Sequence, residues 1–321
     1  MSKMMYGVQI QGFRAALSDT LLDLGEEHKN LVVVDAETGT ATNVLDFRTR
    51  FPDRYVTMGI AEQTALSFAF ALSRSGKIPV VPLFSCFLVR RACDQIFIQI
   101  GYSKANVKMI GCYTGMTSPN TGATHQSIND IAIMRSMPDI MVIETADPGE
   151  LSEAIRAAVD YKGPVYIRMA RGDIKKYEIS CTESHSFRLG KSTVLREGTD
   201  ISLIATGIMV PRALEAAERL AESGVSAEVV NCTAIKPIDK ETLVRSAQKT
   251  GRVVTCENGS IVCGMGSAVA ECLVERCPVP MRMVGVEDKY GWSGPLEDLF
   301  EMYGLTTEKI LEKAGQLLGS K

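Results

Sequence analysis

Apolar residues along the chain follow two patterns that alternate from the N-terminus onward. Between Phe13 and Leu24 they recur at helical spacing, and the continuous apolar run Leu31–Asp35 then predicts a strand. Further strands are predicted for 54–58, 78–83, 107–113, 140–144 and 165–170, mostly with helical patterns between them. Valine and isoleucine runs without polar alternation are typical of strands buried on both faces. This part of the chain therefore predicts a parallel sheet between layers of helices.

The polar stretch 172–190 interrupts this alternation and is expected to be a linker. After it, strands are predicted at 201–207, 226–231, 252–256 and 281–287, with an amphipathic helix at 210–224. The sequence thus predicts an α/β fold with two doubly wound domains. The first is a parallel-sheet domain over 1–178, and the second is a smaller α/β domain over 188–321.

Two short motifs mark helix starts. Asp147, Pro148 and Glu150 predict an N-cap, a first helical residue and the glutamate of a capping box. Gly264 and Gly266 suggest half of a dinucleotide fingerprint, but Val269 occupies the third glycine position. Close packing at the start of a helix explains these glycines better.

Composition narrows the class of protein. The chain has 321 residues, of which 45% are hydrophobic, and a net charge of −3, so a core in each of two domains is expected. No basic run suggests a nucleic-acid or membrane surface, and small molecules or other proteins are the expected partners. Nine scattered cysteines without a Cys-x-x-Cys pair argue against a disulfide framework or a zinc site. With no apolar run long enough to span a bilayer, we expect a reducing, cytoplasmic location.

Glu62 stands at the start of a segment, 58–76, that holds no other charge until Arg74. Its small and apolar residues suit a helix buried on every side. Such an acid can simply complement the helix dipole, worth about 0.3–1 kcal/mol. Alternatively, burial raises a carboxylate's pKa and makes it a useful proton donor or partner near neutral pH. The segment alone leaves both interpretations open.

Two further groups of residues are candidates for chemistry. His125, one of three histidines, lies in a loop (117–127) rich in glycine, serine and threonine after a predicted buried strand, where parallel sheets bind ligands. Arginines beside predicted strand ends can grip phosphate or sulfonate bidentately, and these are Arg90, Arg91, Arg168 and Arg171. Solvated side chains are the plain alternative for both groups.

Seven segments together resemble the C-terminal half of thiamine-diphosphate enzymes of the transketolase family. In order they are FPDRYVTMGIAEQ, PLFSCFLVRRACDQI, GATHQSINDIAIMRSMPDIMVIETAD, GPVYIRMARG, IKPIDKE, CGMGSAVAE and DKYGWSG. Their order and spacing are specific, and they span nearly the whole chain. The resemblance implies a pyrimidine-binding domain followed by a transketolase C-terminal domain.

For the cofactor, the resemblance assigns Glu62 to the glutamate that hydrogen-bonds the pyrimidine ring and favours its imino form, which deprotonates the thiazolium carbon. Phe87 matches the aromatic residue that stacks on the pyrimidine, with Phe84 nearby. Glu37, in DAETGT where the family more often has Asp-Ala-Asp-Leu, is expected to line the site.

For the substrate, the resemblance places His125 in the channel, as a catalytic and donor-binding residue. Arg91 or Arg90, and Arg171, fall where family members bind the terminal phosphate. Thr121 replaces a family aspartate that contacts a donor hydroxyl, so the usual ketose-phosphate preference is open. In the second domain, 257–259 replaces a frequent Glu-Glu-His and is expected to lie away from the chemistry.

The family's Gly-Asp-Gly…Asn motif for magnesium and diphosphate is absent from the sequence, and no metal ligand is assigned here. The resemblance therefore implies the second subunit of a split transketolase (EC 2.2.1.-), active with a diphosphate-binding partner in a two-plus-two assembly. It would move a two-carbon ketol unit from a ketose to an aldose in carbohydrate metabolism of the pentose phosphate type. The beta subunit of a 2-oxoacid dehydrogenase and a non-catalytic regulatory relative are the alternatives. The sugars, and phosphate versus sulfonate, stay open.

Overall fold

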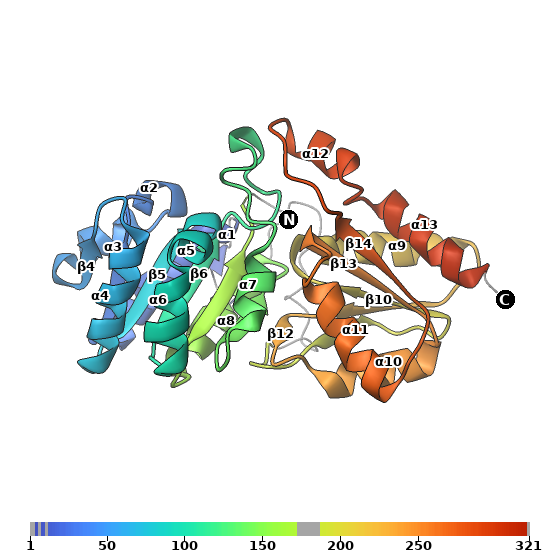
Figure 1. The fold of residues 1–321 in the computed structure, drawn as a ribbon, viewed down its shortest axis with the longest axis horizontal. Coiled ribbons are helices and arrows are strands. Elements are labelled where there is room, and N and C mark those ends of the chain that lie inside the picture. The colour runs from blue at the N-terminus through green and yellow to red at the C-terminus, as the bar shows by residue number, and fades with distance from the viewer. Residues whose placement is uncertain (1–3, 6–7, 10–11, 172–186, 320–321) are drawn as a thin grey trace.

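The computed structural model describes residues 4–5, 8–9, 12–171 and 187–319. These residues form two α/β domains side by side (Figure 1). Two short antiparallel strands, β1 (Met4–Met5) and β2 (Val8–Gln9), precede the first helix. Within the described part of the chain, no helix is long and apolar enough to cross a membrane.

Among the described residues, the first sheet has seven strands in the order β12-β7-β8-β6-β5-β3-β4. Six of them are parallel: β3 (Leu31–Asp35), β4 (Tyr55–Thr57), β5 (Ile78–Phe84), β6 (Lys108–Cys112), β7 (Met141–Glu144) and β8 (Val165–Met169). In register, Lys108 of β6 lies opposite Val80 on one side and Val165 on the other. Since the strands run the same way, the segments that follow them all meet at one edge of the sheet.

Helices cover both faces of this sheet. One face packs against α1 (Phe13–Glu27) and α8 (Pro148–Asp160), and the other against α4 (Glu62–Arg74), α5 (Ser85–Arg91) and α7 (Asp130–Ser136). Short elements complete the domain: α2 (Gly39–Thr42), α3 (Leu45–Arg50), η1 (Pro52–Arg54), α6 (Cys93–Gln95), the π-helix η2 (Ile96–Tyr102) and η3 (Pro119–Thr121).

The second sheet has the order β14-β13-β10-β11-β9. Its strands are β9 (Thr193–Arg196), β10 (Ile201–Ala205), β11 (Ala227–Asn231), β13 (Val253–Ser260) and β14 (Met281–Val286), and β9 alone among these runs antiparallel. Its helices are η4 (Gly207–Met209), α9 (Val210–Glu222), α10 (Lys240–Thr250), α11 (Met265–Arg276), α12 (Leu296–Met302) and α13 (Thr307–Leu318). Helices α10 and α11 lie in front of this sheet in Figure 1. The predicted fold class, two doubly wound α/β domains, is confirmed.

One strand crosses between the two halves, which the sequence patterns do not predict. Strand β12 (Ala234–Lys236) lies in the second half but pairs antiparallel with β7, so that Ala234 faces Ile143. One apolar core cluster also contains buried residues from both sheets. The two halves are therefore packed as one body. The predicted junction, 178–188, falls largely outside the described residues, and those boundaries stay a prediction.

Both motif predictions for helix starts can be compared with the structure. The Asp147 side chain accepts from the Glu150 N–H at 2.8 Å, which confirms the N-cap of α8. The Glu150 carboxylate accepts from the Ala146 N–H at 2.6 Å, one residue before the position that a capping box requires. At α11, a Cβ on Gly266 would meet Thr255 Oγ1 at 2.6 Å, so close packing explains this glycine.

Candidate functional site

Glu62 is the first residue of α4 and lies at the edge where the parallel strands end. Its side chain is 4% exposed, and Oε1 accepts from Arg91 Nη1 at 2.9 Å. The positive end of the helix dipole favours a carboxylate in this first turn. The composition of this helix predicted burial on every side. The structure corrects this, because Gln63, Thr64 and Ala71 are exposed. Small and polar side chains thus cover one open face of α4 beside the site.

Arg91 links Glu62 to an aromatic ring. Its guanidinium carbon lies 4.0 Å from the centroid of the Phe87 ring, within cation–π range. The arginine side chain is 49% exposed, so its pair with Glu62 is open to water on one side. Glu62 itself is nearly buried, so its carboxylate needs a partner, and Arg91 can leave it only when another hydrogen-bond donor takes its place.

Four rings gather next to this pair. Phe84 ends β5, and its centroid lies 5.9 Å from that of Phe87 and 4.6 Å from that of Tyr113. The His125 ring stands edge-on to Phe87 at 4.9 Å. The structure therefore brings together three residues that the sequence singled out, Phe84, Phe87 and His125. Sequence reasoning missed Tyr113, whose only signal was its place directly after strand β6.

His125 belongs to a closed loop, residues 114–127, hereafter the His125 loop. Gly115 and Ser127 pair across its neck, with N–H to O=C distances of 2.9 and 3.1 Å. His125 Nδ1 lies 2.8 Å from Thr124 Oγ1. Burial, followed by the cations Arg91 and Arg90, lowers the pKa of His125 below its ordinary 6.5. The imidazole is consequently neutral near pH 7 and can both donate and accept a hydrogen bond.

The two adjacent arginines of α5 point to different neighbours. Arg91 faces Glu62, whereas Arg90 Nη2 donates to the Thr124 carbonyl at 3.1 Å and Nε to the Cys86 carbonyl at 3.3 Å. Arg90 also lines a cavity between the domains. Arg91 is thus the arginine adjacent to Glu62, and Arg90 supports the His125 loop from outside.

Thr121 belongs to the His125 loop, and Arg171 contacts that loop at another residue. Thr121 Oγ1 lies 2.7 Å from Ser118 Oγ, so this side chain bonds within its own loop. The Arg171 backbone N–H donates to Thr117 Oγ1 at 3.1 Å, and its guanidinium lies 4.8 Å from the Tyr113 ring centroid. Arg171 therefore belongs to the same group of residues as the aromatic cluster.

Glu37 lies at the same edge, between β3 and α2. It is exposed, with a φ of 64°, and Thr57 Oγ1 donates to its carboxylate at 3.4 Å. Nothing among its contacts joins it to Glu62, and its expected place in the site stays a prediction.

Arg168 does not meet the expectation of an anion-binding arginine. It is 0% exposed, and its Nε donates to Asp130 Oδ2 at 2.9 Å, its Nη1 to Glu144, and its Nη2 to the Asn258 carbonyl at 2.7 Å. Burial alone lowers the pKa of Arg168, but Asp130 and Glu144 outweigh it and raise that pKa. Its donors are committed to the protein interior, and no ligand can reach them.

The segment 257–259 was expected to lie away from the chemistry, and the structure corrects this for Asn258. The Asn258 side chain accepts from the Met116 N–H at 3.0 Å and donates to the Thr114 carbonyl at 3.2 Å. Glu257 instead holds the start of α11, accepting from Met265 N–H and Gly266 N–H, each at 2.8 Å. Asn258 therefore reaches the His125 loop, which no short-range sequence pattern could indicate.

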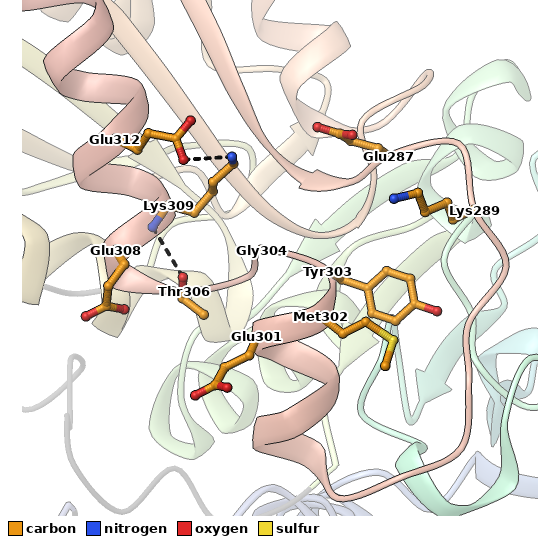
Figure 2. Close-up of a pocket in the computed structure, with 10 residues that line it drawn as sticks. All are labelled: Glu287, Lys289, Glu301, Met302, Tyr303, Gly304, Thr306, Glu308, Lys309 and Glu312. Atoms are coloured by element: carbon orange, nitrogen blue, oxygen red, sulfur yellow. Dashed lines mark hydrogen bonds and ion pairs between the residues drawn. The ribbon is translucent and has the colours of Figure 1, made fainter.

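The described residues form one cavity beside the His125 loop and another within the second domain. The first, of ≈ 390 Å³, lies between part of the His125 loop and the end of β13, and it is lined by Arg90, Gln126, Ser260 and Tyr290 among others. The second, of ≈ 350 Å³, is formed by the second domain alone (Figure 2). There Lys309 Nζ donates to Glu312 at 2.8 Å, and three further glutamates line the walls: Glu287, Glu301 and Glu308. Neither cavity includes Glu62 or His125 in its lining.

Comparisons with known proteins agree with this architecture. The model of the transketolase pyrimidine binding domain matches residues 11–176, and that of the transketolase C-terminal domain matches residues 190–310. The chain is 42% identical, over 94% of its length and 93% of the relative's, to the 6-deoxy-6-sulfo-D-fructose transketolase subunit SqwH of Clostridium sp. (strain MSTE9). It is 35% identical, over 94% and 96%, to one of the subunits of the apulose-4-phosphate transketolase of Phocaeicola vulgatus.

Solved structures extend this likeness to three dimensions. A structure described as "Split gene transketolase, inactive beta4 tetramer" superposes with a TM-score of 0.89 at 40% identity, covering 96% of this chain and 99% of the other. The match takes in both sheets and nearly all of either chain. The chain belongs to the transketolase family, and it comprises the family's pyrimidine-binding domain followed by its C-terminal domain.

Proposed function

We propose that this chain is the pyrimidine-binding subunit of a thiamine-diphosphate-dependent transketolase that moves a two-carbon ketol unit from a ketose to an aldose. The observation that carries the proposal is the nearly buried Glu62 carboxylate beside Phe87 and His125 at the carboxyl edge of the sheet. Ligands in parallel α/β folds bind at this edge.

The described residues fit the pyrimidine end of thiamine diphosphate. Glu62 offers a nearly buried carboxylate, placed to share a hydrogen bond with a ring nitrogen, and Phe87 with Phe84 offers apolar ring surface for stacking. When bound, the cofactor supplies the nucleophilic carbon that makes and breaks the carbon–carbon bond. Arg91 occupies Glu62 Oε1 in this structure and would move aside, which its half-exposed position allows.

The diphosphate end is assigned to another chain. Within residues 12–171 and 187–319, no group of three or more His, Cys, Asp or Glu side chains could hold a metal ion. Mg²⁺ prefers oxygen ligands together with substrate phosphates, and we place that site on a partner carrying the Gly-Asp-Gly…Asn motif. Two named relatives are described as transketolase subunits, and the similar solved chain is described as an inactive tetramer, which supports dependence on a partner.

The substrate is expected to carry an anion at the end away from the reacting carbons. Arg91 and Arg171 lie beside the Phe87 and Tyr113 rings, where either could bind phosphate or sulfonate bidentately. One relative is named for a sulfonated fructose and another for a phosphorylated apulose, so both anions occur among similar chains. His125, neutral near pH 7, would hydrogen-bond the donor's hydroxyl or carbonyl.

Two other interpretations remain distinct from this proposal. A 2-oxoacid dehydrogenase beta subunit would share the two-domain layout. The reaction of that enzyme, however, would release carbon dioxide from a 2-oxoacid. A non-catalytic relative would have no use for a buried carboxylate, an aromatic cluster and two arginines at one edge, and their joint presence argues against it.

Reconstitution tests the proposal. The purified chain is mixed with a diphosphate-binding transketolase chain, thiamine diphosphate, Mg²⁺, an aldose and either 6-deoxy-6-sulfo-D-fructose or apulose 4-phosphate. Ketol transfer is expected from the pair and from neither chain alone. Robust turnover by this chain alone would contradict the need for a partner, and carbon dioxide release from a 2-oxoacid by the pair would favour the dehydrogenase interpretation.

A further inference from the structure

The second domain holds the His125 loop at several points. Besides the Asn258 contacts, the Gly294 N–H donates to the Pro119 carbonyl at 3.2 Å, and the Ser260 N–H donates at 2.7 Å to the carbonyl of Ile128, the residue directly after the loop. Gln126 Nε2 donates to the Trp292 carbonyl at 2.9 Å. Figure 1 shows the green loop of the first domain and the red segment before α12 projecting beside each other at the top of the view, where the two domains meet. The loop that carries His125 is thus bounded by the other domain.

Asn258 makes the most specific of these contacts. Its side chain is 0% exposed and uses both ends of its amide, accepting from Met116 N–H and donating to Thr114 C=O. Both partners flank Gly115, which forms the neck of the loop with Ser127. A Cβ on Gly115 would lie 2.4 Å from Asn258 Nδ2, so the two residues are in close packing. An asparagine amide can match one N–H and one C=O at once, as few side chains can.

The backbone of Asn258 is bonded to a group of buried charged residues. Its backbone carbonyl accepts from Arg168 Nη2 at 2.7 Å, and Arg168 is fixed in turn by Asp130 and Glu144. Asp130 begins α7 and also accepts from Ser85 at 2.9 Å, next to Phe84. A chain of buried contacts therefore runs from the aromatic cluster through Arg168 to Asn258 and back to the His125 loop.

We propose that Asn258 is a positioning residue for the substrate site: by pinning the neck of the His125 loop, it sets the place of His125 against Phe87. This rests on the proposed function, and it gives the second domain a direct part in the site. Asn258 touches neither Glu62 nor any residue assigned to the cofactor among its hydrogen-bond partners. Its effect should fall on the sugar donor and leave cofactor binding unchanged.

The first test needs neither partner nor substrate. In the full-length chain labelled with ¹³C-histidine, NMR titration follows His125, which is one of only three histidines and is assigned with a His125→Asn variant. Asn258→Ala removes both loop contacts, and the loosened loop should expose the imidazole, so its pKa should rise towards the ordinary 6.5. Asn231→Ala is the matched control, because Asn231 also joins the domains, through Glu150 at 2.9 Å, without touching the loop.

The second test uses the reconstituted pair. Asn258→Ala is expected to raise the KM of the sugar donor about tenfold, equivalent to about 1.4 kcal/mol, while the Kd of thiamine diphosphate stays as in the wild type. Asn258→Asp keeps the size and the acceptor atom for the Met116 N–H but cannot donate to the Thr114 carbonyl, so the KM of the sugar donor should still rise. This variant also serves if Asn258→Ala does not fold.

The outcomes separate this inference from the proposed function. A shifted His125 pKa in Asn258→Ala but not in Asn231→Ala supports positioning even if no transketolase activity is found. The inference is overturned if Asn258→Ala and Asn258→Asp leave both the His125 pKa and the donor KM unchanged. It is equally overturned if Asn231→Ala shifts them as much, since the effect would then belong to the domain interface in general.

Discussion

Replacing Arg168 with methionine should destabilise both domains together. The guanidinium is fully buried and makes charge-assisted bonds to Asp130 and Glu144, and its loss leaves two carboxylates inside the protein without their cation. Breaking one side of a buried ion pair costs about 3–5 kcal/mol. For 321 residues the entropy of unfolding is about 0.7 kcal/mol/K, so the midpoint of thermal unfolding should fall by about 4–7 °C.

Scanning calorimetry measures this change, and a single transition is expected in both proteins because one apolar core spans the two sheets. The matched control neutralises the whole group, with Arg168→Met, Asp130→Asn and Glu144→Gln combined. No unpaired charge is then left inside, and most of the lost stability should return. A fall of less than 1 °C for Arg168→Met alone, or a triple variant less stable than the single one, would refute the reasoning.

Three further predictions follow from single contacts. Arg91→Met should raise the pKa of His125 towards 6.5, because a nearby cation disfavours the imidazolium; an NMR titration with no upward shift would contradict the geometry. Gly111→Ala should lower the free energy of unfolding by about 1–3 kcal/mol, since its Cβ would lie 2.3 Å from Tyr166 Oη; urea unfolding at wild-type stability would argue against that packing. Asp147→Ala should cost about 1 kcal/mol through loss of the α8 N-cap, while Asp160→Ala, at the last residue of that helix, should cost less in the same urea assay.

The sequence predicted the strands well because buried parallel strands are largely apolar runs, as β5 is throughout and β3 is up to Asp35. It could not predict that β12 joins the sheet of the other domain, since a three-residue strand carries almost no periodicity. In addition, the register of β12 on β7 depends on contacts between residues that are far apart in the sequence. Such pairing is fixed by packing between the domains, and local patterns do not report it.

For the site, the residues that follow strands were predictable because parallel strands end at one edge. Glu62, Phe87 and His125 meet there through that rule. The roles of the arginines were not predictable, because a guanidinium reaches far and its partners decide its function. Arg168 and Arg171 are only three residues apart in the sequence. Arg168 is nevertheless enclosed by carboxylates, whereas Arg171 lies over the Tyr113 ring.

The most direct measurement is the turnover of Glu62→Gln in the reconstituted pair. If the Glu62 carboxylate holds a proton against the cofactor ring, kcat should fall by about 10²- to 10⁴-fold, with the complex still assembled. Glu308→Gln is the matched control, because Glu308 is an exposed acid in the first turn of α13 and should leave kcat unchanged. If Glu62→Gln turns over at the wild-type rate, the carboxylate serves only the helix dipole, and the central claim is contradicted.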